Sequence, residues 1–179
     1  MAKTFDPRRL DVRRFAEESG ELSGDSLVSA YERLQGETDR RGADAPVRWS
    51  AQGELRNAGH VRPDVWLHLE AEARVPLVCQ RCLGPVEVDL EVDRSFRFVA
   101  DEATAAAEDD EAEEDVLAES RQFDLQELIE DELLMALPVA PRHDVCPELP
   151  RFAVEDEGFE QAAEEKKNPF AVLQGLKKH

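Results

Sequence analysis

Cysteine and histidine residues with the spacing of metal ligands occur at two distant places in the sequence. Cys79 and Cys82 are separated by two residues in VCQRCLGPV, and His143 and Cys146 have the same spacing in PRHDVC. Two thiolates at a tight turn can point at one ion, and a second pair would complete the four-coordinate set of a structural zinc site. These four residues are therefore a candidate zinc site, closed and without a position for a substrate.

Two other interpretations of Cys79 and Cys82 stay open at the level of sequence. The pair could be a thioredoxin-like redox couple, although that motif normally opens a helix, whose N-terminus lowers the thiol pKa. The thiols could also be small buried groups at a turn that binds no metal. Because the chain has three cysteines, they cannot all pair with one another, and in a reducing compartment thiols or metal ligands are favoured over disulfides.

Hydrophobic periodicity predicts the strands that position this turn. From about Pro46 apolar and polar residues alternate in VRWSAQGEL, VWLHLEAEARV and VEVDLEVDRSFRFV. A period of two is typical of antiparallel strands with one solvated face. Cys79 and Cys82 fall between the last two of these predicted strands, where Gly84 would allow the backbone to curl back.

A predicted helix leads into the second pair of ligands. The segment FDLQELIEDELLMAL has helical spacing, with Asp124 as N-cap and Glu127 as its capping-box partner. Pro138 and Pro141 end this helix just before His143. One side of the helix carries Leu125, Leu128, Ile129, Glu132 and Met135, and it is widened by Leu133, Leu134, Ala136 and Leu137.

A second helix is predicted near the N-terminus, in SLVSAYERLQGE. Ser26 is its expected cap, and its apolar face would carry Leu27, Ala30, Tyr31 and Leu34.

The fold class that follows is α+β, with an antiparallel sheet that could curl toward a barrel and an amphipathic helix that covers it. A single domain is expected over residues 1–152. Residues 101–119 hold many acids and no basic residue, which predicts a solvated, mobile loop within that domain. Residues 153–179 are expected to form an acidic linker and a short basic, apolar tail.

The charge of the chain limits the partners it can take. The 179 residues carry a formal net charge of -19, which repels nucleic acid and anionic lipid at long range and attracts basic proteins. No apolar run approaches the roughly 20 residues that span a bilayer, and the N-terminus lacks the apolar block of a signal peptide. We therefore expect a cytoplasmic protein with no membrane partner.

Catalytic patterns are not evident in the sequence, and no catalytic residue is assigned. No glycine-rich phosphate loop or dinucleotide fingerprint occurs, and no histidine lies in a nucleophile motif. The carboxylates lie mostly in solvated runs, so no acid–base pair stands out. A non-enzymatic role is the expectation.

Three blocks of sequence, taken in order, resemble the YceD family of bacterial proteins. The blocks are CQRCLGPVEVDLEV, DLQELIEDELLMALPVAPRHDVC and KNPFAVLQGLK, which together cover roughly the second half of the chain. Besides the four candidate metal ligands, the residues that match the family motifs are Pro138, Pro141, Asn168, Pro169, Phe170 and Leu173.

The resemblance implies a role in the synthesis, processing or stability of large-subunit (23S) ribosomal RNA, with no established enzymatic activity. An acidic protein would reach RNA most simply through a basic ribosomal protein or assembly factor, although direct contact with rRNA is a second route. The alternatives are a thiol- or metal-dependent enzyme acting on pre-rRNA and a generic zinc-knuckle interaction module.

Overall fold

A computed structural model describes residues 5–147 except residues 39, 58 and 60. The chain divides into two compact units, Met1–Cys146 and Pro147–His179, and the described residues belong almost entirely to the first. The expected linker and tail at 153–179, the domain boundary after residue 152 and the motif residues Asn168, Pro169, Phe170 and Leu173 lie outside the described residues.

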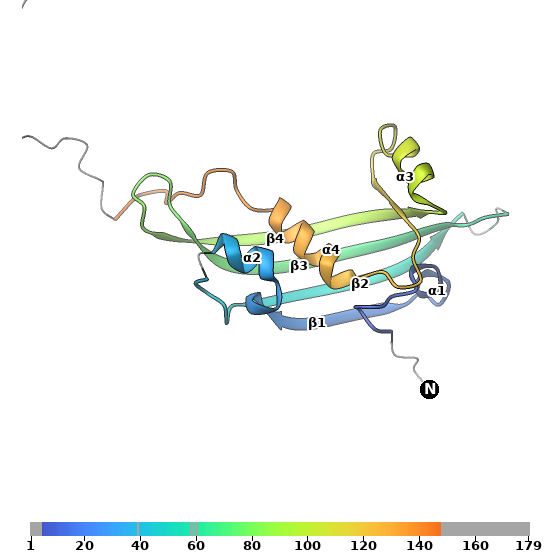
Figure 1. Ribbon diagram of the computed structural model, residues 1–179, viewed down its shortest axis with the longest axis horizontal. Helices are drawn as coiled ribbons and strands as arrows, with labels where there is room; N and C mark the ends of the chain where they lie inside the picture. The colour runs from blue at the N-terminus through green and yellow to red at the C-terminus, as the bar shows by residue number, and fades with distance from the viewer. Residues whose placement is uncertain (1–4, 39, 58, 60, 148–179) are drawn as a thin grey trace, which may run out of the picture. The chain divides into compact units, whose positions relative to one another are not determined.

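One five-stranded sheet forms the centre of the described unit (Figure 1). Its strands are β1 (Glu21–Leu27), β2 (Pro46–Arg56), β3 (Asp64–Val78), β4 (Pro85–Val99) and β5 (Asp115–Ala118), and they lie side by side in that order. The first three pairings are antiparallel and the last is parallel. The α+β class and the largely antiparallel sheet are thus confirmed.

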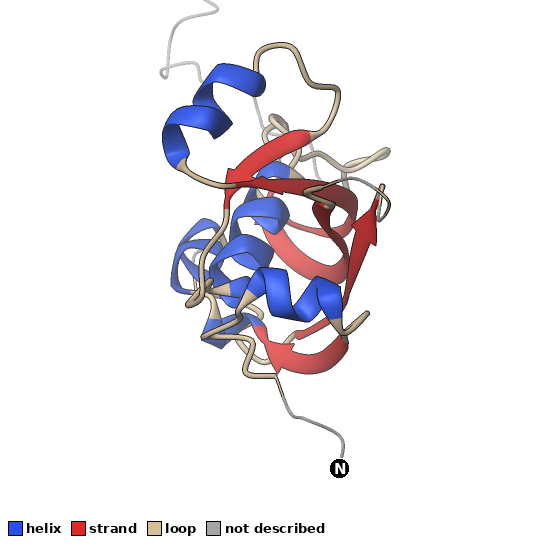
Figure 2. Cartoon of the chain, turned by 90° about the vertical axis from the view of Figure 1, so that its right-hand side faces the viewer, coloured by secondary structure: helices blue, strands red, loops and turns tan. Residues whose placement is uncertain are grey.

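Closure of the sheet toward a barrel is not observed. β1 and β5, at the two edges, do not pair with each other, and a barrel needs every edge strand to be paired. Helices occupy the face that a barrel would turn inward, so the apolar side chains of the sheet are covered without closure (Figure 2).

Strict alternation along the two long strands separates a buried face from a solvated one. In β3 every second side chain is buried, and the register with β4 places most of these residues opposite buried residues of the neighbouring strand, with exposed Arg94 opposite Leu69 as an exception. The buried side chains of β3 are Val65, Leu67, Leu69, Ala71, Ala73, Val75 and Leu77. The predicted strand pattern is therefore confirmed residue by residue in β3.

Four helices and one 3-10 turn complete the unit. They are α1 (Val12–Glu17), the turn η1 (Val28–Ala30), α2 (Glu32–Glu37), α3 (Glu102–Glu108) and α4 (Leu125–Met135). Side chains of α1, α2 and α4 join those of the strands in one hydrophobic core.

The start of α4 agrees with the sequence, and its end does not. The Asp124 carboxylate accepts hydrogen bonds from the backbone N–H groups of Gln126 and Glu127, at 2.9 and 3.2 Å, so the predicted cap is confirmed. Met135 is 79% exposed instead of buried. The helix buries Leu125, Leu128, Ile129 and Leu133.

The prediction of one continuous helix from Ser26 is wrong. β1 continues through Leu27, which pairs with Pro46 of β2, and the α-helix begins only at Glu32. Ser26 Oγ lies 2.8 Å from the Tyr31 hydroxyl instead of capping a helix. Strand pairing with β2, a long-range interaction, thus outweighs the local helical pattern.

Residues 101–119, expected to form a solvated, mobile loop, contain regular structure, namely α3 and β5. The side chain of Asp101 caps α3 by accepting from the Thr104 N–H at 2.8 Å. Arg97 of β4 forms ion pairs with Glu108 and Glu114, at 2.7 and 2.6 Å. Residues 101–119 contain no lysine or arginine. Arg97, from the neighbouring strand β4, supplies the positive charge that orders two of their acids.

Gly53 marks the close approach of α1 to the sheet. A Cβ at Gly53 would lie 2.6 Å from Phe15 Cδ1 and 3.0 Å from the backbone nitrogen of Ala16. At Gly36, in α2, a Cβ would meet nothing within 4 Å. The two positions therefore form a matched pair for testing the packing of α1.

We expect Gly53→Ala to lower the free energy of unfolding by about 1–3 kcal/mol, because the helix backbone must shift to admit the methyl group. Gly36→Ala should leave stability unchanged or raise it by up to about 1 kcal/mol, since alanine favours a helix. Urea titration followed by circular dichroism measures both. Equal effects of the two substitutions would contradict this packing.

Candidate metal centre

The turn between β3 and β4 places the first two candidate ligands. The Cys79 N–H donates to the Gly84 carbonyl and the Leu83 N–H donates to the Cys79 carbonyl, both at 2.8 Å. Within this turn, Leu83 has a left-handed backbone conformation, with φ of 61°. The sequence suggested that Gly84 would provide the bend. A leucine in this conformation is strained, and its side chain is 72% exposed.

The segment that follows α4 places the other two ligands. The Gln80 N–H donates to the Pro141 carbonyl at 2.8 Å, which joins this segment to the β3–β4 turn. His143 adds a second link, because its Nε2 lies 2.9 Å from the Pro85 carbonyl oxygen. A carbonyl can only accept, so Nε2 donates to it, and the neutral form of the ring then has its lone pair on Nδ1.

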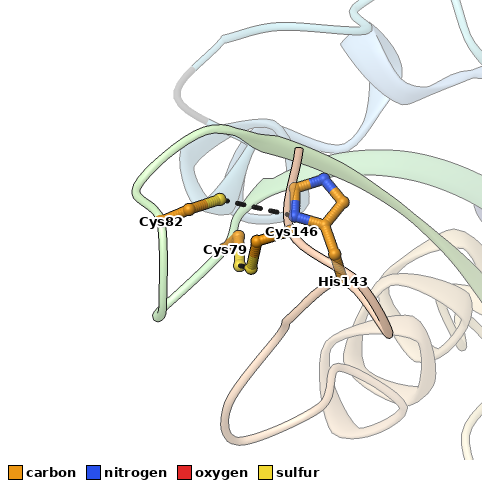
Figure 3. Close-up of side chains that lie close together, drawn as sticks. All are labelled: Cys79, Cys82, His143 and Cys146. Atoms are coloured by element: carbon orange, nitrogen blue, oxygen red, sulfur yellow. Dashed lines mark hydrogen bonds between the residues drawn. The ribbon is translucent and has the colours of Figure 1, made fainter. Parts of the chain in front are cut away.

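All four candidate ligands meet at one end of the sheet (Figure 3). Their ligand atoms lie within 4.8 Å of one another. Cys79 Sγ is 3.8 Å from Cys146 Sγ, and Cys82 Sγ is 3.4 Å from His143 Nδ1. The two cysteines of the turn point toward the two residues of the segment after α4.

These separations fit four-coordinate binding of a metal ion. With metal–sulfur and metal–nitrogen bonds of about 2.3 and 2.05 Å, tetrahedral geometry separates two sulfurs by about 3.8 Å and a sulfur from a nitrogen by about 3.6 Å. The observed distances of 3.8 and 3.4 Å are close to these values. The cluster could therefore hold a metal ion.

The electrostatics of the cluster differ from one thiol to the next. Burial raises the pKa of Cys79, but hydrogen bonds from the backbone N–H groups of Cys82, His143 and Arg81 outweigh it and lower this pKa to about 5. The pKa of Cys146 is raised, first by burial and then by the neighbouring sulfurs. Only the thiolate binds a metal, so at neutral pH Cys79 is already in the ligating form.

The surroundings of the cluster were only partly predictable. The structure places Pro138 and Pro141 in the segment between α4 and His143. The Gln80–Pro141 and His143–Pro85 hydrogen bonds were not foreseen. The proline-rich spacing before His143 is the signal that an extended segment follows the helix there.

Comparison with known proteins places the chain in a family. Residues 67–177 match the family model described as "Large ribosomal RNA subunit accumulation protein YceD". The chain belongs to the YceD family. A Haemophilus influenzae protein of that same description is 36% identical over 184 residues, which cover 99% of each chain. No solved structure matches the chain.

The YceD match includes both halves of the candidate metal centre, since residues 67–177 contain the β3–β4 turn and the segment after α4. The family description concerns large-subunit ribosomal RNA and names no metal. Among the helices of the described residues, none is long and apolar enough to cross a bilayer.

Proposed function

We propose that the protein supports accumulation of large-subunit (23S) ribosomal RNA in the cytoplasm, without catalysing a reaction, by binding a basic ribosomal protein or assembly factor. The observation that carries this proposal is the similarity along almost the whole chain to a large ribosomal RNA subunit accumulation protein. The family model, which matches residues 67–177, supports the same process.

The charge of the protein favours an indirect route to RNA. Extended contact with phosphates requires many lysine and arginine side chains, whereas this chain has 41 acidic and 22 basic residues. On the solvated face of the sheet, Glu70 lies directly opposite Asp93 and Glu72 directly opposite Glu91. Like charges in opposed positions repel each other, so a cation bound there would relieve unfavourable interactions.

A structural zinc ion is part of the same proposal. Cys79, Cys82, His143 and Cys146 would hold it, and zinc bound by four protein ligands has no open position for catalysis. The bound ion would act as a cross-link between the β3–β4 turn and the segment after α4. The His143 Nε2–Pro85 hydrogen bond orients the ring for coordination through Nδ1.

We expect the purified protein to contain about one zinc ion per chain, as four ligands of this kind form one closed site. His143→Ala should lower the zinc content at least severalfold and lower the melting temperature. His68→Ala is the matched control, because His68 lies on the solvated face of β3 and should retain the metal.

Elemental analysis after dialysis against dilute zinc measures this content. A folded wild-type protein that holds no metal under these conditions would contradict the zinc site. An unchanged zinc content in His143→Ala would contradict the proposed ligand set.

Affinity capture of the tagged protein from its own cells tests the function. We expect a basic large-subunit protein or assembly factor to be enriched at low salt and lost at high salt, because the screening length falls from about 10 Å at 0.1 M to about 3 Å at 1 M. Nuclease treatment before elution separates the two routes to RNA. The partner should remain bound after nuclease treatment.

Two results of the capture would count against the proposal. Loss of every protein partner on nuclease treatment would mean that RNA carries the contact. Absence of any ribosomal component at either salt concentration would contradict a role in ribosome assembly. Cleavage of large-subunit precursor RNA by the purified protein would support the enzymatic alternative instead.

A further inference from the structure

The edge of the sheet at β4 is unpaired over most of its length. β5 pairs with β4 only from Phe96 to Val99. Within the described residues, no strand pairs with the outer side of β4 from Pro85 to Ser95. Alternate residues of such an edge direct their N–H and C=O groups away from the sheet, where another strand can bind them.

From Val86 to Asp93 the side chains along this free edge alternate between two chemical types. On the core side lie Val86, Val88, Leu90 and Val92, all buried or half-buried. On the solvated side lie four acids at alternate positions, Glu87, Asp89, Glu91 and Asp93, which are all exposed. A strand added here would therefore meet apolar side chains on one face and carboxylates on the other.

The acids of the edge differ in whether a nearby cation neutralises them. Arg74 of β3 lies within 3.9 Å of Glu87 and 3.6 Å of Asp89. Glu91, by contrast, faces Glu72 across the strand pair, and no ion pair joins Glu91 within the described part of the chain. Glu91 thus retains capacity for a cation from outside.

A hollow beside the same edge offers space next to the strand. It lies between β4 and the end of α4, has a volume of about 450 Å³, and includes Val92, Glu132 and Met135 in its lining. The exposed side chain of Met135 is flexible and polarisable, which suits it to contact varied apolar side chains. The Arg94–Asp115 ion pair marks the end of the hollow where β5 begins.

We propose that the free edge of β4 binds an extended segment of a basic protein as an additional strand, with Lys or Arg alternating with apolar residues. This inference rests on the proposed function, because it assigns the contact surface for the basic partner. Backbone hydrogen bonds to β4 would provide affinity, and the alternating side chains would provide specificity. The basic side chains would lie beside the acids at 87, 89, 91 and 93.

A second copy of the chain is a poorer occupant of the edge. Pairing of two β4 edges would bring the acids of one copy beside those of the other on the same face of the extended sheet. Like charges in such positions are destabilising, and charge on an edge strand is a common protection against self-association. The complementary partner is therefore basic.

The probe for this site is a blocked, fluorescently labelled peptide of four Lys-Val repeats. We expect it to bind the full-length protein at low salt, and the double substitution Asp89→Lys/Glu91→Lys to weaken binding about tenfold or more, since each reversal turns an attraction into a repulsion. The control, Glu21→Lys/Asp25→Lys, reverses two acids of β1, the other edge strand. The control should change the affinity by less than about twofold.

A second peptide separates strand addition from simple charge attraction. Methylation of alternate backbone nitrogens preserves every charge and removes the donors that would pair with β4. We expect this peptide to bind at least tenfold more weakly. Amide hydrogen exchange of the complex should show new protection within residues 87–95 when the unmodified peptide is bound.

Several outcomes would overturn the proposal. Equal binding of the methylated and unmodified peptides would mean that charge attraction alone holds the peptide, without strand pairing. If the charge reversals in β1 and in β4 weaken peptide binding equally, the peptide does not bind specifically at the β4 edge. A dimer in sedimentation that Asp89→Lys/Glu91→Lys abolishes would assign the edge to a second copy. If that variant still captures large-subunit proteins from cells at the wild-type level, the edge is not the contact, while the proposed function stands.

Discussion

The antiparallel pairing of β3 with β4 is the constraint on which the other features of this protein depend. The register runs without interruption from Val65 opposite Phe98 to Val78 opposite Pro85. It directs the apolar side chains of both strands to one face and the acids to the other. It also brings the ends of the strands close enough for Cys79 and Cys82 to share one short turn.

The same pairing determines where the second half of the metal centre can lie. α4 packs against the buried face of β3 and β4, and the proline-rich segment after it reaches the turn. Two hydrogen bonds join the two segments independently of any ion, from the Gln80 N–H to the Pro141 carbonyl and from the His143 side chain to the Pro85 carbonyl. A bound metal would then strengthen a junction that hydrogen bonds have already formed, which agrees with a structural role.

The sequence predicted what depends on local pattern and missed what depends on long-range pairing. The long strands and the Asp124 cap follow from periodicity and side-chain chemistry, and the structure confirms them. The prediction of a helix from Ser26 was wrong because Ser26 pairs with Val47 of β2 in the sheet. The helix and strand within residues 101–119 were missed because acids of this segment pair with Arg97, a residue of a neighbouring strand. The four candidate metal ligands were predicted as a set. Where they come together, however, depends on how α4 crosses the sheet.

The strong negative charge and the link to ribosomal RNA are compatible if the protein contacts a basic protein. A direct test is the ratio of large-subunit to small-subunit rRNA in cells whose gene carries Asp89→Lys/Glu91→Lys, with Glu21→Lys/Asp25→Lys as control. We predict that the ratio falls in the β4 variant, at normal protein level, and stays at the wild-type value in the β1 control. An unchanged ratio in the β4 variant would contradict the central claim that the acidic β4 edge connects this protein to the large subunit.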